Sequence, residues 1–194
     1  PNFFFNTIFF KFDYGKYLRT PSNTEKFNDK INSNFFNIAI CWRGQPSKID
    51  EGRSFSLKFF HKIAELPGVN LISVHKGFGE SEVNLVDFSV TTFDENFDQT
   101  DGAFIDTIRV LNSCDLVITS DTSIAHLSGA LNLPTWIVLQ KLPDWRWGVD
   151  SNSSVWYENV RIFRQQEQEN WTSVFDEVCA SLKDVMSWDK KNGK

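Results

Sequence analysis

The chain has 194 residues, of which 41% are hydrophobic and 23% are charged, and its net charge at pH 7 is −5. This composition is typical of a folded globular protein rather than a disordered chain, and the length suits one well-filled domain. The acidic balance argues against a nucleic-acid binder, because a phosphate backbone requires a basic protein surface.

No apolar stretch reaches the roughly 18 residues that a membrane-spanning helix requires, so we expect no membrane span. The three cysteines, Cys41, Cys114 and Cys179, are scattered and form no C-x-x-C pair. We expect them to be free thiols of a cytoplasmic protein, and we expect no metal site.

The first twelve residues, PNFFFNTIFFKF, contain six phenylalanines and no initiator Met. They lack the basic region and the small-residue cleavage site of a signal peptide. We therefore interpret the chain as part of something longer, or as processed.

From residue 37 onward, short apolar runs alternate with helical patterns, which is typical of βαβ units on a parallel sheet. We expect strands at 37–42, 70–74, 85–88, 115–119, 134–139 and 160–163. We expect helices at 57–64, where Ser56 is the cap, at 106–113, at 122–131, and from Trp171 to Val185, where apolar residues recur at helical spacing. The polar stretch 91–101 reads as a loop.

These elements predict an α/β fold with a Rossmann-like, doubly wound parallel sheet of about six strands. Numbered along the chain, the strands are expected in the order 3-2-1-4-5-6. In such sheets, ligands bind beyond the carboxyl ends of the strands, near the switch between the first and the fourth.

The loop after the fourth predicted strand combines an acidic residue with hydroxyls and opens a helix. Asp121 is placed to cap that helix, and a cap alone explains it. Thr122 and Ser123 add hydroxyls to exposed amides and to the positive end of the helix dipole, which together favour an anion. His126 shares a helix face with Thr122, opposite the core face. It is either an ordinary surface histidine or a partner of that anion.

Three further places at the same edge carry candidate residues, each with a plainer alternative. Arg53, after the first strand, is a second charge for the anion or a solvated loop arginine. Lys76, after the second strand, contacts a nucleotide or is simply solvated. Trp145 and Trp147 flank Arg146 after the fifth strand, where they pack locally or stack on a sugar or a base.

Several familiar signatures are absent from the sequence. It has no G-x-G-x-x-G and no P-loop motif, which disfavours a plain NAD site and a P-loop enzyme. It also lacks D-x-D, H-E-x-x-H and G-x-S-x-G, which removes the common metal-diphosphate, zinc-protease and hydrolase readings. A phosphohydrolase on the same sheet would lack a visible nucleophile.

The segments 114–119, 121–127 and 129–131 resemble the D-T-x-x-A-H-L-x-G-A-L block of bacterial heptosyltransferase-like glycosyltransferases. These proteins are often associated with tetratricopeptide repeats and are distantly akin to O-GlcNAc transferases. Other segments match the same family: Tyr17–Arg19, the W-x-G-x-P loop from Trp42 to Pro46, Arg53–Leu57, Lys76–Gly77, Pro143–Trp147, Trp156–Tyr157, Phe163–Gln165 and Trp171. The resemblance covers about residues 14 to 185.

The resemblance implies the C-terminal, donor-binding half of a metal-independent GT-B glycosyltransferase. Residues 1–36 would be a Phe-rich remnant and interdomain segment, 37–188 the nucleotide-sugar-binding domain, and 189–194 a tail. The substrate would be a nucleotide-diphosphate sugar, with no cofactor. The catalytic base would come from the N-terminal domain of such a fold. The partner of this chain would be an N-terminal acceptor domain or a tetratricopeptide-repeat region.

The resemblance also implies roles for residues of this chain. His126 and Arg53 would be catalytic by stabilising the leaving diphosphate. The donor diphosphate would be bound by Gly44, Asp121, Thr122, Ser123 and Lys76. Trp145 and Arg146 would line the sugar or acceptor edge.

The chain departs from the family pattern at a few positions. His75 stands where Gln is common, Gln140–Leu142 replaces a more apolar run, and Ile49–Gly52 lacks an N-D pair. The alternative reading is a non-catalytic nucleotide-sugar-binding or interaction module without its acceptor domain.

Overall fold

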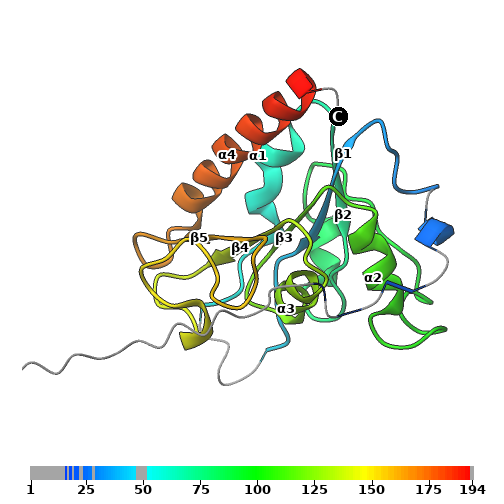
Figure 1. Ribbon diagram of the computed structural model, residues 1–194, viewed down its shortest axis with the longest axis horizontal. Helices are drawn as coiled ribbons and strands as arrows, with labels where there is room; N and C mark the ends of the chain where they lie inside the picture. Colours follow the sequence, from blue (N-terminus) through cyan, green and yellow to red (C-terminus); the bar gives the residue numbers. More distant parts are fainter. Residues whose placement is uncertain are drawn as a thin grey trace, which may run out of the picture.

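The computed structural model describes residues 16, 18, 20–21, 24–27, 29–46 and 52–192. At its centre is a parallel sheet of five strands in the order β2-β1-β3-β4-β5 (Figure 1). The strands are β1 (Phe36–Cys41), β2 (Val69–Ser73), β3 (Leu116–Thr119), β4 (Thr135–Leu139) and β5 (Val160–Arg164). Every neighbouring pair is parallel, so all five carboxyl ends meet at one edge.

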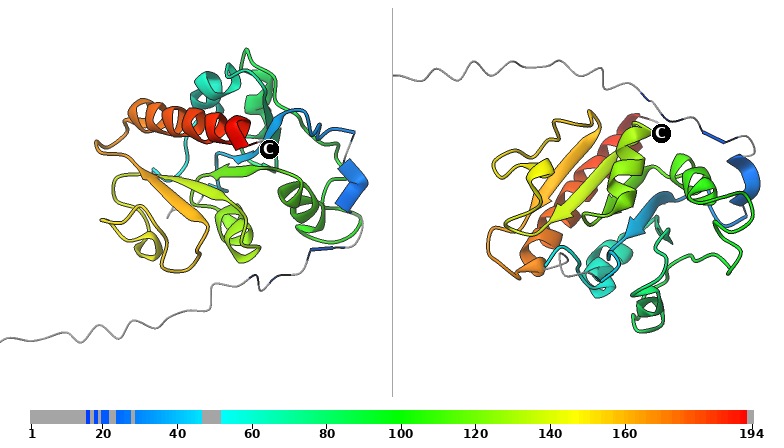
Figure 2. Two further views of the ribbon diagram at one scale, coloured as in Figure 1. Left: turned by 45° about the horizontal axis from the view of Figure 1, so that its top comes forward. Right: turned by 90° about the horizontal axis from the view of Figure 1, so that it is seen from below.

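Helices cover both faces of the sheet. Short 3-10 turns, η1 (Thr24–Phe27), η2 (Leu57–Phe60), η3 (Glu80–Asn84) and η4 (Trp145–Trp147), accompany the α-helices α1 (His61–Ala64), α2 (Ile105–Asn112), α3 (Ser123–Ala130) and α4 (Trp171–Asn192). Helices α1 and α4 lie on one face, and α2 and α3 on the other (Figure 2).

The two faces follow from the alternation of side chains along each strand. In β1, Ile38 and Ile40 belong to the core under α1 and α4, whereas Ala39 and Cys41 belong to the core under α2. Because both faces are covered, the central strands β1, β3 and β4 are buried and mostly apolar, with Asn37, Thr119 and Thr135 as their polar positions. The predicted α/β, doubly wound class is confirmed.

The predicted third strand at 85–88 is wrong. Leu85 is 81% exposed, and Val86 and Phe88 pack against the α1/α4 core instead of extending the sheet beside β2. The chain touches the sheet edge only later, where a single parallel bridge pairs Ile72 with Thr91. Without that strand, the remaining strands keep the order expected from the sequence.

Part of the predicted interdomain segment packs on the domain. Lys26 in η1 places its Nζ 2.8 Å from Oδ1 of the buried Asp106 in α2, and Phe27 contacts the rings of Phe93 and Phe97. Residues 1–15, Tyr17, Arg19 and Ile49–Glu51 lie outside the described residues. None of the described helices is long and apolar enough to cross a membrane.

Candidate functional site

A pocket of about 290 Å³ opens at the carboxyl ends of β1, β2 and β3, beside the first turn of α3. It brings together five residues predicted from the sequence: Gly44, Arg53, Lys76, Thr122 and Ser123. They come from three separate loops, so only the parallel arrangement of the strands makes them neighbours. The switch region of the sheet is therefore hollow, as expected.

A larger hollow of about 710 Å³ lies at the opposite edge, near the amino ends of the strands. Asp115 is the one charged residue among those lining it, and most of the others are apolar. The smaller pocket is the better candidate for a charged ligand, because the helix terminus and the cationic side chains converge there.

The first turn of α3 differs in detail from the prediction. The helix begins at Ser123, and Thr122 rather than Asp121 is its N-cap. The Thr122 side chain makes no cap hydrogen bond, and its Oγ1 instead lies 3.0 Å from Thr119 Oγ1. Asp121 is buried and is not among the lining residues. The N-cap side chain thus leaves the amides of the first turn uncapped within the part of the chain that the structure describes, and a helix N-terminus of this kind is suited to an anion.

Three cationic side chains line the pocket. The Nη2 of Arg53 donates to the carbonyl of Gln45 at 3.3 Å, and the guanidinium lies so close to Gly44 that a Cβ there would be 2.9 Å from Nη2. Lys76 donates from Nζ to the Phe97 carbonyl. Arg43 pairs with Glu82 at 2.7 Å. The first two were predicted, and Arg43 was not.

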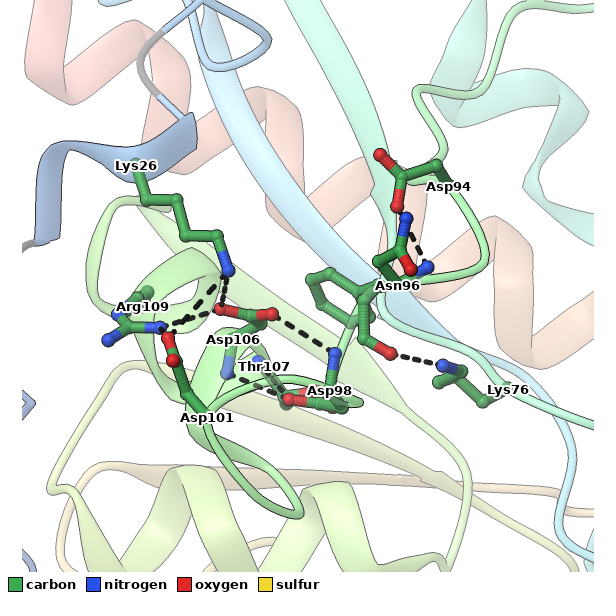
Figure 3. Close-up of polar contacts among 10 residues, drawn as sticks. Lys26, Lys76, Asp94, Asn96, Asp98, Asp101, Asp106, Thr107 and Arg109 are labelled. Atoms are coloured by element: carbon green, nitrogen blue, oxygen red, sulfur yellow. Dashed lines mark hydrogen bonds and ion pairs between the residues drawn. The ribbon is translucent and has the colours of Figure 1, made fainter.

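The aromatic side chain of Phe104, at the N-terminus of α2, forms one wall of the pocket. Phe104 is 41% exposed and has a left-handed backbone, with φ of 64°, which is unusual for a bulky residue. It occupies the N-cap position of α2 without a side-chain cap bond. Asp98 caps the helix instead, as Figure 3 shows, by accepting hydrogen bonds from the amides of Asp106 at 2.8 Å and Thr107 at 3.0 Å. Phe104 itself lines the pocket.

His126 stacks on Trp147 of η4, the turn that also carries Trp145 and Arg146, so these residues form a second cluster. His126, Trp145 and Arg146 do not line the pocket. His126 accepts or donates through Nδ1 to the Tyr157 hydroxyl at 3.0 Å. Its pKa is lowered by burial, and further by the positive charge of Arg146. Trp145 is 76% exposed. Trp147 is buried, so local packing is the correct reading for that indole.

Some pocket residues were missed by sequence reasoning. Arg43 directly follows the first predicted strand, and that position was a usable signal. Asp98, Phe104 and Thr107 carried none, because they reach the pocket only through the packing of α2 beside β1 and β3. Among the described residues, no group of three or more His, Cys, Asp or Glu side chains is arranged to hold a metal ion.

No family model and no curated protein matches the sequence. Among solved structures, the chain is similar to E. coli ADP-heptose LPS heptosyltransferase II, with a TM-score of 0.61 and 12% identity over 89% of this chain and 54% of that one. It is also similar to E. coli heptosyltransferase WaaC with ADP, with a TM-score of 0.53 and 15% identity over 80% of this chain and 47% of that one.

The chain thus spans about half the length of the heptosyltransferases that it matches. The structure and the comparisons together establish a fold: an α/β domain with the architecture of one Rossmann-like half of a GT-B structure.

Proposed function

We propose that this chain is the C-terminal, nucleotide-sugar donor-binding domain of a metal-independent GT-B glycosyltransferase that requires no cofactor. The observation that carries the proposal is the pocket, where the N-terminus of α3 meets Arg43, Arg53 and Lys76. A helix terminus combined with several cations fits a diphosphate better than a neutral ligand. The free cysteines suit a cytoplasmic location.

The diphosphate would be held by the amides of the first turn of α3, by the Thr122 and Ser123 hydroxyls, and by the cations. Lys76 would exchange the Phe97 carbonyl, its present partner, for a phosphate oxygen. A charge-assisted hydrogen bond of this kind contributes about 1.5 to 3 kcal/mol. The same groups would stabilise the charge that develops on the leaving diphosphate.

The nucleoside would lie against the α2 wall of the pocket, with its base on the Phe104 ring. Stacking of a base on an aromatic side chain contributes about 1 to 3 kcal/mol. The exposed ring of Phe104 and its strained backbone support this assignment, because backbone strain tends to be retained at binding sites.

The second cluster would face the sugar. His126 does not line the pocket, so the leaving diphosphate would extend past the first turn of α3 to meet it, with Arg146 beside it. A bound diphosphate would raise the pKa of His126 and so favour its protonated form. Trp145 would offer its exposed indole to the sugar or the acceptor. The catalytic base would come from an N-terminal acceptor domain. The partner of this chain would be that domain or a tetratricopeptide-repeat region.

The alternative is a non-catalytic module that binds a nucleotide sugar or another protein. It would bind the same nucleotide at the same pocket, and it would stay inactive when joined to an acceptor domain. Turnover by the complete protein distinguishes the two readings, and nucleotide binding by this chain tests what they share.

The test is calorimetric titration of the chain with UDP, ADP and GDP in 1 mM EDTA, repeated with Lys76→Met. We expect saturable binding of one nucleotide, weakened roughly 10- to 100-fold by the loss of one charge-assisted bond. Lys58→Met is the matched control, because Lys58 is exposed in η2 and does not line the pocket. Binding that requires Mg²⁺, or no binding of any of the three nucleotides at millimolar concentration, would contradict the proposal.

A further inference from the structure

His75 lies in the wall of the pocket, two residues beyond β2 and next to Lys76. It is 4% exposed, and its ring stacks on the indole of Trp42 with centroids 4.2 Å apart. A polar ring this deeply buried must satisfy both of its nitrogens. The partners of these two hydrogen bonds identify the segments that His75 holds in place.

The first bond runs from Nε2 to the carbonyl oxygen of Phe78, at 2.8 Å. A carbonyl can only accept, so Nε2 carries the hydrogen. The bond closes the turn from His75 to Phe78, which contains Lys76, and Gly77 supplies the positive φ within it. The backbone of Lys76 is thus fixed from within its own turn.

The second bond joins Nδ1 to the Cys41 sulfur, 3.5 Å away. Burial lowers the pKa of His75, opposed by the charges of Glu80 and Glu82 and reinforced by that of Arg43. Because the ring is neutral and Nε2 holds the hydrogen, Nδ1 accepts. Burial raises the pKa of the Cys41 thiol to about 11, so the thiol is protonated. Its one hydrogen has two acceptors within reach, and we assign it to Nδ1 of His75 at 3.5 Å, which is nearer than the Arg43 carbonyl at 3.9 Å.

The Cys41 sulfur in turn contacts α3. It lies 3.8 Å from the Thr122 hydroxyl, which donates to it, and Cys41 itself lines the pocket. His75 is therefore bonded directly to the Lys76 turn and, through one sulfur, to the N-cap of α3. These are the two segments on which anion binding would depend.

We propose that His75 is a positioning residue of the pocket: its Nε2–H holds the Lys76 turn, its Nδ1 orients the Cys41 thiol beneath Thr122, and a nucleoside diphosphate binds tightly only while the Lys76 turn is held. The geometry stands on its own, and the identity of the ligand rests on the proposed function.

The tautomer is tested without any ligand. A long-range ¹H–¹⁵N spectrum of the imidazoles at pH 7.5, with His75 assigned by its loss in His75→Gln, should show the hydrogen on Nε2 of His75. A hydrogen on Nδ1 would overturn the bond to Phe78 and the proposal with it.

The positioning role is tested by two substitutions that each keep one bond. The amide of His75→Gln reaches the Nε2 position and can still donate to Phe78, whereas the shorter amide of His75→Asn reaches only the Nδ1 position. We expect His75→Asn to weaken binding of the preferred nucleotide about tenfold and His75→Gln to remain within about threefold, as expected for one hydrogen bond.

A double-mutant cycle with Lys76→Met separates positioning from a general loss of stability. If His75 acts through Lys76, adding His75→Asn to Lys76→Met should weaken binding by less than about twofold, because coupled residues are not additive. Full additivity, or a folded His75→Asn chain with wild-type affinity, would overturn the proposal. Failure of the wild-type chain to bind any nucleotide would instead count against the proposed function. The imidazole spectrum would still test the hydrogen bond from His75 to Phe78, because it requires no ligand.

Discussion

The imidazole of His126 stacks on the indole of Trp147, with ring centroids 5.0 Å apart and an interplanar angle of 21°. Trp147 is 2% exposed and belongs to η4, the turn that also carries Trp145 and Arg146. The orientation of His126 is therefore set by the loop after β4, not by α3 alone. The stack thus joins α3 to the loop after β4 at the carboxyl edge of the sheet.

Trp147→Ala should remove both the stack and a large buried side chain. We expect the free energy of unfolding to fall by about 3 to 5 kcal/mol, the usual cost of such a truncation. Trp147→Phe is the control, because it keeps an aromatic face and sacrifices no hydrogen bond: Nε1 of Trp147 has no partner within the described structure. Urea unfolding followed by circular dichroism measures both variants. Equal losses for the two would show that the stack contributes nothing specific.

Asp98→Ala should destabilise α2 through the loss of its cap. Asp98 accepts hydrogen bonds from two amides of the first turn and from the Thr107 hydroxyl at 2.5 Å, so we expect a loss of about 1 to 2 kcal/mol of unfolding free energy. Asp94→Ala is the matched control, because the Asp94 carboxylate accepts only within its own exposed turn, from the amide of Asn96. A similar loss for both variants in urea would contradict the capping role.

Gly44→Ala should weaken nucleotide binding while leaving the fold intact. The Gly44 backbone does not adopt a positive φ, so alanine fits its conformation, but the new Cβ would displace the Arg53 guanidinium. We expect a loss of roughly tenfold in affinity by calorimetry, corresponding to about 1.4 kcal/mol. In an Arg53→Met background the same change should cost almost nothing. A Gly44→Ala chain with wild-type affinity would mean that the position of Arg53 is unimportant for binding.

Stability should fall as the pH is lowered from 7 to 5. Burial lowers the pKa of both His75 and His126 in the folded chain, so the unfolded chain binds more protons below its ordinary histidine pKa of about 6.5. By linkage, the unfolding free energy rises with pH through this window and levels off above pH 7. Urea unfolding at pH 5, 6, 7 and 8 should show a smaller slope in His75→Gln/His126→Gln than in the wild-type chain. An unchanged slope would show that neither histidine is responsible.

The local periodicity of the sequence predicted most of the fold because it reports which face of an element is buried. The alternation in β1 and the helical spacing from Trp171 to Val185 were sufficient to place both elements. The segment 85–88 was wrongly predicted to be a strand. Its residues Val86 and Phe88 pack against the core under α1 and α4 and do not join the edge of the sheet. An apolar pattern indicates that a segment is buried, but it does not indicate which element of the fold covers it.

The residues of the candidate site also fall into two groups, those that the sequence predicted and those that it did not. Gly44, Arg53, Lys76 and Thr122 lie in the loops that follow β1, β2 and β3, and Ser123 begins α3 at the end of the loop after β3. In a parallel sheet the carboxyl ends of neighbouring strands must meet, so the sequence by itself determined that these loops converge. It did not determine that Asp121 is buried outside the pocket, that Asp98 caps α2 from eight residues away, or that Phe104 forms a wall. Those arrangements were decided only in the tertiary structure, because they depend on the course of the loop that leads into α2 and on how α2 and α3 pack against the sheet, and the apolar periodicity of the sequence encodes neither.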